Sequence, residues 1–372
     1  MHFFALDNRP GICQFYTKTG SRRKGIFHFC EVLMNRREFL KGLATTGAAI
    51  TGMAAAGGLF VPFAEALEIP KFNFAHITDL HLDVRGESNW QHREKSVPLF
   101  IDALRQLGRL PKLNFVVFGG DQIHYGPNDK ESLDVFQKWT AQLDVPFYIL
   151  LGNTEVSPIT GVSKLTKADY LQAWSGRGVK PKQSSWAFDP VRGVRIIGFD
   201  TTVDGKPYGE AALNDIKWLE NELTTGADKK LIIVFMHHPV MPTTPQDTTP
   251  AWSLWMLKNR SKMRDIFERH PNVRLVVSGH HHASRVETVG KITYVADPAI
   301  VSYPCAFRAY TVTREGIHLR QVGLDDTASV NRALELLVSD PYARLYNAEA
   351  PQSVAAYCMG LTEKDRETTI KL

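Results

Sequence analysis

Five apolar segments of this chain each end in a short polar sequence, and this repeated arrangement most strongly limits the folds that it can adopt. The apolar segments have the length and composition of buried β-strands, and amphipathic stretches with helical spacing separate several of them. Strands that alternate with helices predict an α/β protein. The five polar sequences are Asp79-x-His81, Gly120-Asp121, Gly152-Asn153, His237-x-Pro239 and Gly279-His280-x-His282.

The elements are expected at definite places. The apolar runs predict strands over residues 74–77, 114–118, 146–151, 195–199, 230–235, 273–277, 291–296 and 309–312. Helical spacing predicts helices over residues 98–110, 134–143, 210–223, 262–270 and 331–338. In open α/β sheets ligands bind beyond the carboxyl ends of the strands, so the polar ends are expected to converge there. Residues 240–249 form a candidate lid or substrate-facing loop, and the residues after 310 are expected either to cap the sheet or to cover the site.

The polar ends carry side chains that bind metal ions. Imidazole and carboxylate groups suit Zn, Fe, Mn or Co. One residue between two ligands in an extended segment would place both on one side of the backbone, which accounts for the D-x-H and H-x-H spacings. The set is too large for one ion, but it suits two ions about 3.5–4 Å apart that share a carboxylate and clamp a phosphoryl group.

In this order, the five sequences resemble the signature of the calcineurin-like metallophosphoesterases, which is D-x-H, G-D, G-N-H-(D/E), H and G-H-x-H. The resemblance covers roughly residues 72–300. It implies a four-layer α/β/β/α sandwich of two mixed sheets flanked by helices. It also implies a phosphodiesterase or phosphatase in which a hydroxide bridging two metals attacks phosphorus. The implied ligands are Asp79, His81 and His282 for one metal, Asn153, His237 and His280 for the other, and Asp121 as the bridge.

The chain departs from this family pattern at Thr154, where relatives have histidine. A hydroxyl group cannot act as a general acid near neutral pH as imidazole can. Three outcomes stay open: catalysis by the metals alone on esters with good leaving groups, replacement by another group, or feeble catalysis. His124 is the nearest replacement, although it could instead be a further metal ligand. The catalytic candidates are therefore Asp121, His124 and His238. His238 is expected to contact substrate or to support a ligand.

Other functions were weighed against this hydrolase. A non-catalytic metal-binding protein on the same fold is the main alternative. An amidohydrolase barrel is disfavoured, because that class opens with the H-x-H sequence that here closes the series. Most of the net charge of +5 lies in residues 1–66, which hold eight Lys or Arg and four Asp or Glu. The rest is nearly neutral, so we expect no nucleic-acid binding and a small-molecule or lipid-derived phosphoester as substrate.

The first 66 residues have the features of an export signal. Asn35–Lys41 reads N-R-R-E-F-L-K and resembles the twin-arginine motif, and an apolar stretch rich in Ala and Gly follows it. The stretch ends in Ala64-Glu65-Ala66, which fits a signal peptidase site. We therefore expect recognition by the twin-arginine machinery, cleavage after Ala66, a periplasmic or secreted protein and no stable membrane anchor.

The expected boundaries follow from this signal. Because Met34 stands directly before the twin arginines, residues 1–33 are interpreted as a mis-assigned or extended N-terminus and residues 34–66 as the signal peptide. Residues 67–372 are expected to form a single domain, with a core over 72–315 and a C-terminal extension over 316–372. Cys305 and Cys358 could pair in an oxidising compartment, but two cysteines in a domain of this size are more often free.

Overall fold

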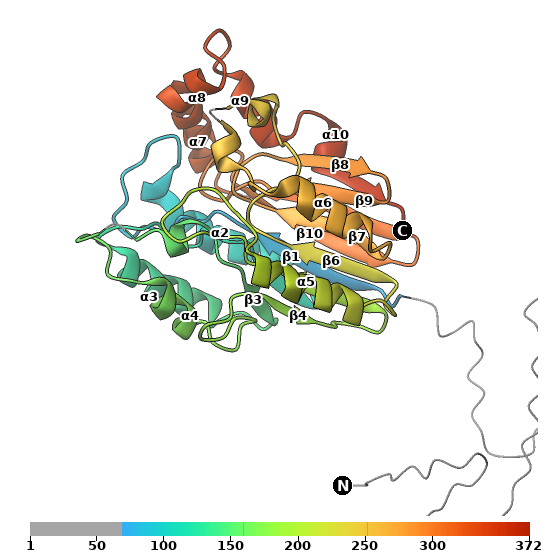
Figure 1. Cartoon of the computed structure of the whole chain (residues 1–372). Coiled ribbons are helices and arrows are strands. Elements are labelled where there is room, and N and C mark those ends of the chain that lie inside the picture. The colour runs from blue at the N-terminus through green and yellow to red at the C-terminus, as the bar shows by residue number, and fades with distance from the viewer. Residues whose placement is uncertain (1–68, 159, 251) are drawn as a thin grey trace, which may run out of the picture. The chain divides into compact units, whose positions relative to one another are not determined.

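The computed structural model describes residues 69–372 apart from 159 and 251, and these residues lie within one compact unit. The interpretations of residues 1–33 and of the signal peptide at 34–66 lie outside the described residues. Within them, the strands form two six-stranded sheets that face each other, with helices on the outer sides (Figure 1). The predicted four-layer α/β/β/α sandwich is confirmed.

The first sheet has the order β12-β11-β10-β1-β2-β3. β1, β2 and β3 are parallel, whereas β10, β11 and β12 join antiparallel, so the sheet is mixed. Its strands are β1 (Phe72–Ile77), β2 (Phe115–Phe118), β3 (Phe147–Ile149), β10 (Ala306–Thr313), β11 (Gly316–Gly323) and β12 (Glu367–Ile370).

The second sheet has the order β4-β5-β6-β7-β9-β8 and is also mixed. Four central strands are parallel, and an antiparallel strand closes each edge. Its strands are β4 (Trp186–Phe188), β5 (Val194–Gly198), β6 (Leu231–Phe235), β7 (Val273–Ser278), β8 (Arg285–Val289) and β9 (Ile292–Ala296).

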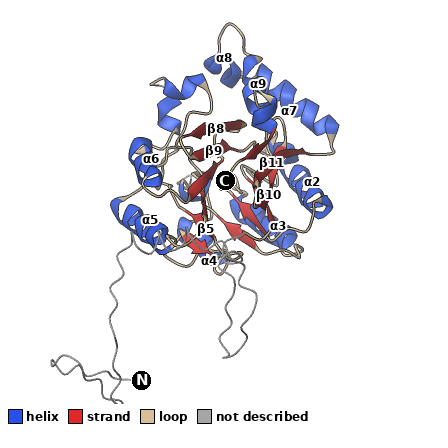
Figure 2. Cartoon of the chain, turned by 90° about the vertical axis from the view of Figure 1, so that its right-hand side faces the viewer, coloured by secondary structure: helices blue, strands red, loops and turns tan. Residues whose placement is uncertain are grey.

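Helices cover the outer face of each sheet. α2 and α3 lie against the first sheet and α5 and α6 against the second, while α7, α8 and α9 gather at one end (Figure 2). The longer helices are α2 (Ser96–Arg109), α3 (Asp129–Thr140), α5 (Leu213–Thr225), α6 (Arg260–Glu268) and α7 (Thr327–Ser339). The shorter ones are α4 (Lys167–Ala173), α8 (Pro341–Tyr346), α9 (Ser353–Met359) and α10 (Glu363–Arg366), with 3₁₀ turns η2 (Arg93–Lys95), η3 (Thr154–Val156), η4 (Pro245–Thr248) and η5 (Trp252–Trp255).

Strand β6 shows why the sheets need cover on both faces. All five of its residues are apolar and buried. Leu231, Ile233 and Phe235 join the core between the two sheets, whereas Ile232 and Val234 join the core under α5 and α6. Successive side chains of a strand point to opposite faces, so a continuous apolar run fits a strand that is buried on both sides. Parallel pairing with β5 and β7 sets the direction of β6, and the following histidines therefore lie at its carboxyl end.

The C-terminal segment both extends a sheet and covers the site. β11 and β12 continue the first sheet beyond β10, and α8 contributes residues to the cavity described below. Cys305 and Cys358 are free and buried. No helix within the described range is both long and apolar enough to cross a bilayer.

Candidate metal centre

All five polar sequences directly follow strands, namely β1, β2, β3, β6 and β7. These strands are parallel within their own sheets, so their carboxyl ends in each sheet open toward the same edge. Two groups of buried His and Asp side chains form there, and in each group the potential ligand atoms lie within 4.8 Å of one another. Cluster 1 consists of Asp79, His81 and His282, and cluster 2 of Asp121, His237 and His280.

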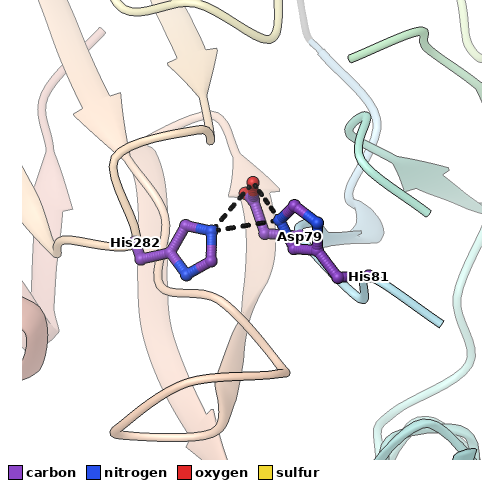
Figure 3. A group of neighbouring side chains, drawn as sticks. All are labelled: Asp79, His81 and His282. Atoms are coloured by element: carbon purple, nitrogen blue, oxygen red, sulfur yellow. Dashed lines mark hydrogen bonds and ion pairs between the residues drawn. The ribbon is translucent and has the colours of Figure 1, made fainter. Parts of the chain in front are cut away.

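Cluster 1 joins the beginning of the described chain to a loop two hundred residues later. The Nε2 atom of His282 lies 3.4 Å from Oδ1 of Asp79 and 3.3 Å from Nε2 of His81 (Figure 3). The atoms of His282 and Asp79 that point away from this contact are held by hydrogen bonds. Nδ1 of His282 lies 2.7 Å from the Ser302 hydroxyl, and Thr78 donates to Oδ2 of Asp79. The remaining atoms, Oδ1 and the two Nε2, therefore face a common point.

Cluster 2 is oriented in the same way. Nδ1 of His237 lies 2.8 Å from the carbonyl oxygen of Gly119 and donates a hydrogen bond to it. The other ring nitrogen, Nε2, therefore keeps a free lone pair. Nε2 of His237, Nε2 of His280 and Oδ1 of Asn153 are all buried without a hydrogen-bond partner. Buried polar atoms are rarely left unpaired, so these atoms are suited to coordinate a cation.

Asp121, a member of cluster 2, also reaches cluster 1. Its Oδ2 is 3.4 Å from Nε2 of His81 in cluster 1, and its Oδ1 is 3.5 Å from Nε2 of His237 in cluster 2. Thr154 donates to Oδ1 of Asp121 through its backbone N–H and its hydroxyl, at 2.9 and 3.0 Å. Thr154 therefore orients this carboxylate, a contact that the sequence did not predict.

The backbone at the ligands is strained. Five predicted ligands have positive φ, from 40° to 71°: Asp79, His81, Asp121, His280 and His282. Among the other described non-glycine residues, only Lys182 and Cys305 share this conformation. Left-handed backbone is unfavourable for residues with a Cβ and tends to concentrate at functional sites. The expectation that extended backbone aligns the ligands of the D-x-H and H-x-H sequences is therefore wrong, because alternating left-handed residues align them.

Two glycines allow groups of the site to approach closely. A Cβ on Gly152 would lie 2.2 Å from Oδ1 of Asp121, and one on Gly279 would lie 2.6 Å from Oδ2 of Asp79. Neither glycine has positive φ, so both are needed for space, not for a tight turn.

The protonation states of the clustered side chains suit the binding of cations. Burial opposes ionisation of Asp121, but the neighbouring His237 and His81 outweigh it and hold the pKa of Asp121 well below its usual value. Burial disfavours a charged His237, yet Asp121 raises the pKa of His237 to about 9. Burial lowers the pKa of His81 to about 3. Metal binding requires deprotonated ligands, so a cation would replace the proton on His237 as the partner of Asp121.

Glu155 is a positioning residue that sequence reasoning missed. This fully buried carboxylate accepts hydrogen bonds of 2.7–3.2 Å from the backbone N–H groups of Gly152, Asp121, Gln122 and Ile123. It thereby joins the loops after β2 and β3, which carry Asp121 and Asn153. The family pattern G-N-H-(D/E) contained the signal, since its last position is an acid.

His76 lies in the core. Its Nδ1 lies 2.8 Å from Oδ2 of Asp297, and Oδ1 of Asp297 accepts from the fully buried Arg308 at 2.5 Å. The backbone N–H of Asp297 donates to the carbonyl of Ser278, at the end of β7. This buried network therefore joins β1, β10 and the strand that precedes His280.

The remaining catalytic candidates occupy different positions. His124 lines a cavity of about 320 Å³ together with His81, Asp121 and Asn153, and its Nδ1 is buried and unpaired. Burial and the neighbouring Arg93 lower the pKa of His124 to about 4, so the ring is neutral near pH 7. His238 does not line this cavity. It is fully buried, and its Nδ1 lies 2.8 Å from the Thr201 hydroxyl.

The candidate lid is tied to the metal loop. Asp247 in η4 accepts from the backbone N–H of Thr243 at 2.7 Å and lies 3.1 Å from Nδ1 of His281. His281 stands between the ligands His280 and His282, so it links η4 to cluster 1 and cluster 2. Because Thr244 and Asp247 line the cavity, the segment faces the space where a substrate would bind.

A family model described as calcineurin-like phosphoesterase matches residues 72–284. A probable glycerophosphodiester phosphodiesterase, GpdQ, of Arcobacter nitrofigilis is 26% identical over 212 residues, which is 57% of this chain and 71% of that protein. A 3′,5′-cyclic-nucleotide phosphodiesterase of a Nostoc species is 24% identical over 229 residues, covering 61% and 77%. A dimetal phosphatase structure from Danio rerio superposes with a TM-score of 0.57 at 17% identity, covering 68% and 96%.

The strand-end clusters and these similarities define a metallophosphoesterase fold, in which two mixed sheets are flanked by helices. The chain belongs to the calcineurin-like phosphoesterase family, because the family model matches more than half of it. The prediction of a metallophosphoesterase is therefore confirmed at the level of the family.

Substitution of the central carboxylate tests the metal centre. We expect Asp121→Ala to lose both metals, because it removes the group shared by the clusters, and Asn153→Ala mainly to lose the metal of cluster 2. Metal content per chain is measured by plasma mass spectrometry after loading with Mn or Zn and desalting. Asp134→Ala, which removes an exposed carboxylate of α3, is the control. Two tightly held metals in Asp121→Ala would contradict the assignment.

Proposed function

We propose that this chain is an exported phosphodiesterase that hydrolyses its substrate with two metal ions. The observation that carries the proposal is the placement of Asp121, whose two carboxylate oxygens face separate clusters 3.4 and 3.5 Å away. Two ions held in this way suit an in-line phosphoryl displacement. Asp79, His81 and His282 would hold one ion, Asn153, His237 and His280 the other, and Asp121 both.

A diester is favoured over a monoester by two observations. Both relatives described above are named as phosphodiesterases. In addition, the residues that line the described cavity include no Lys or Arg. A monoester carries close to two negative charges near neutral pH, whereas a diester carries one, so a cavity without Lys or Arg suits the diester better.

The residues of the chain have distinct parts in this reaction. Bound metal ions would supply Lewis acidity and lower the pKa of water. Thr154 and Glu155 hold Asp121 and its loop in one arrangement, so the ligands need little reorganisation. His124 presents a neutral ring to the cavity, and its N–H can donate a hydrogen bond to a phosphate oxygen of the substrate. His238 supports the ligand loop from behind through Thr201.

Turnover of bis(p-nitrophenyl) phosphate tests this function directly. We expect hydrolysis that depends on added Mn or Zn, at least about a thousandfold slower in Asp121→Ala because electrostatic stabilisation of the transition state is lost. Release of p-nitrophenolate is followed by absorbance, with Asp134→Ala as control. If two metals are bound but no metal-dependent turnover occurs, the chain is the non-catalytic metal-binding protein considered above.

The lack of a histidine after Asn153 gives a second prediction. With a neutral His124 and a hydroxyl at Thr154, no strong general acid protonates the leaving oxygen, so the rate should depend steeply on leaving-group pKa. We expect kcat for bis(p-nitrophenyl) phosphate to exceed that for diphenyl phosphate by about 10²-fold or more. Thr154→His should reduce this ratio of kcat values, because imidazole can act as the missing general acid.

Thr154→Ala is the matched control, because it removes the same hydroxyl bond to Asp121 without adding imidazole. A ratio close to one in the unmodified protein would show that a general acid operates after all.

Export is supported by the N-R-R-E-F-L-K sequence and the Ala64-Glu65-Ala66 site. We expect the double change Arg36→Lys and Arg37→Lys to retain the precursor in the cytoplasm of a host with the twin-arginine pathway, although charge is kept. Immunoblots of cell fractions measure this, and the same double change at Arg332 and Arg344, two exposed residues of the domain, is the control. N-terminal sequencing of the exported protein should begin at Leu67. Equal export of both double variants would exclude the twin-arginine route.

A further inference from the structure

One side of the cavity at the metal centre is aromatic. The rings of Trp90 and Tyr342 stack with centroids 4.5 Å apart, and Trp252 meets Tyr342 and Tyr346 edge to face at 5.3 and 6.1 Å. Trp255 and Leu345 line the same cavity. These residues come from the loop after β1, from η5 and from α8. We call this set the aromatic wall: Trp90, Trp252, Trp255, Tyr342, Leu345 and Tyr346.

The aromatic wall is continuous with both clusters. The Trp90 ring lies 4.8 Å from the ring of His282, and the Trp255 ring lies 6.0 Å from that of His280. A phosphate held at the clusters would thus leave its substituents within reach of the wall.

The wall also leaves apolar surface open to solvent. Trp255 is 42% exposed and Leu345 is 74% exposed, and they are two of the five large apolar side chains that are exposed among the described residues. Adjacent exposed apolar groups at a cavity are typical of a binding surface, because covering them removes apolar area from water. The other three, Val162, Leu213 and Leu361, do not line the cavity.

Charge around the cavity limits what else the wall can bind. Its described lining has no Lys or Arg, and Asp247 adds a buried carboxylate beside the wall. A second anionic group on the substrate would therefore find no Lys or Arg there, and His281 is already paired with Asp247. A neutral apolar group would instead contact aromatic faces and a leucine, with a favourable loss of hydrated area.

Part of the wall lies outside the segment that defines the family. The family model ends at residue 284, whereas Tyr342, Leu345 and Tyr346 come from α8. α8 is held in place by its own small core, in which Tyr346 and Ala343 pack with Leu337, Val354 and Cys358. The aromatic wall is thus an ordered part of this chain's structure, and family membership does not account for it.

We propose that the aromatic wall binds an uncharged apolar arm of the substrate, so that the enzyme selects singly charged phosphodiesters carrying an aryl ring or an alkyl chain over those with small or polar arms. This inference rests on the proposed phosphodiesterase function and specifies its substrate class. Trp255 and Leu345 act as specificity-determining residues, and neither is a metal ligand.

Three simple diesters with poor leaving groups test the proposal: diphenyl, dibutyl and dimethyl phosphate. Each carries one negative charge and two identical arms, so the result does not depend on which arm meets the wall. Inhibition constants are measured against bis(p-nitrophenyl) phosphate turnover by the metal-loaded full chain, with ligand-detected NMR as a second readout of binding. We expect diphenyl or dibutyl phosphate to bind about tenfold or more tighter than dimethyl phosphate, the gain from burying one ring or chain.

Exposed positions supply variants that should leave the fold intact. Trp255→Ala and Leu345→Ala should each reduce the preference for the apolar diester several-fold, through the inhibition constant and KM more than through kcat. Leu361→Ala, which shortens an equally large exposed side chain away from the cavity, is the matched control and should preserve the preference. The tighter of the diphenyl and dibutyl esters identifies the arm as a ring or a chain.

Two failures can be told apart. Turnover with equal binding of all three diesters, or a preference unchanged in Trp255→Ala and Leu345→Ala, overturns the wall while the phosphodiesterase function stands. Absence of metal-dependent turnover overturns the function itself, and NMR then still shows whether the wall binds the apolar diesters.

Discussion

The carboxylate of Asp121 is the group on which the site depends, because it alone faces both clusters. It is almost fully buried, at 2% exposure, and has His81 near one oxygen and His237 near the other. A buried anion is costly unless it is paired and hydrogen-bonded. Thr154 supplies the hydrogen bonds, and cations at the clusters would supply the pairing. The fold therefore acts as a scaffold that keeps the charge of Asp121 in place.

That scaffold is rigid where the chemistry lies. Left-handed backbone at five ligands costs free energy of order 1–3 kcal/mol at each residue, so the surrounding structure must hold them. It does so through strands buried on both faces, through Glu155 binding four backbone N–H groups, and through the buried network of His76, Asp297 and Arg308. The ligands are consequently positioned by elements far from one another in the sequence.

The α/β class and the main strands could be predicted because their signals are local, whereas the four-layer arrangement was predicted from the family resemblance. The apolar runs that became β1, β2, β6 and β7 are continuous and end in unmistakable polar residues. The helix expected over 134–143 instead begins at Asp129, since its first turn is polar and Asp129 is buried by bonds to the distant backbone of Lys164 and Leu165. The short strands β4, β8 and β12 exist through pairing with neighbours, and their own residues carry little pattern.

The same distinction applies to the site. The candidate ligands were predicted from the family resemblance, and their residue types agree with what coordination chemistry requires. The bonds of Thr154 to Asp121, the position of His238 behind the ligands and the aromatic side of the cavity depend on tertiary contacts between remote segments. Such contacts cannot be predicted from periodicity or from motifs.

The origin of the cavity walls has an evolutionary consequence. The residues of cluster 1 and cluster 2 follow the strands of the two sheets, whereas Tyr342, Leu345 and Tyr346 belong to a short helix that packs on its own apolar cluster. Selection can therefore alter that helix, or exchange it, with little disturbance to the reactive end of the cavity. Related chains could diverge in what they recognise while keeping one way of breaking the ester bond.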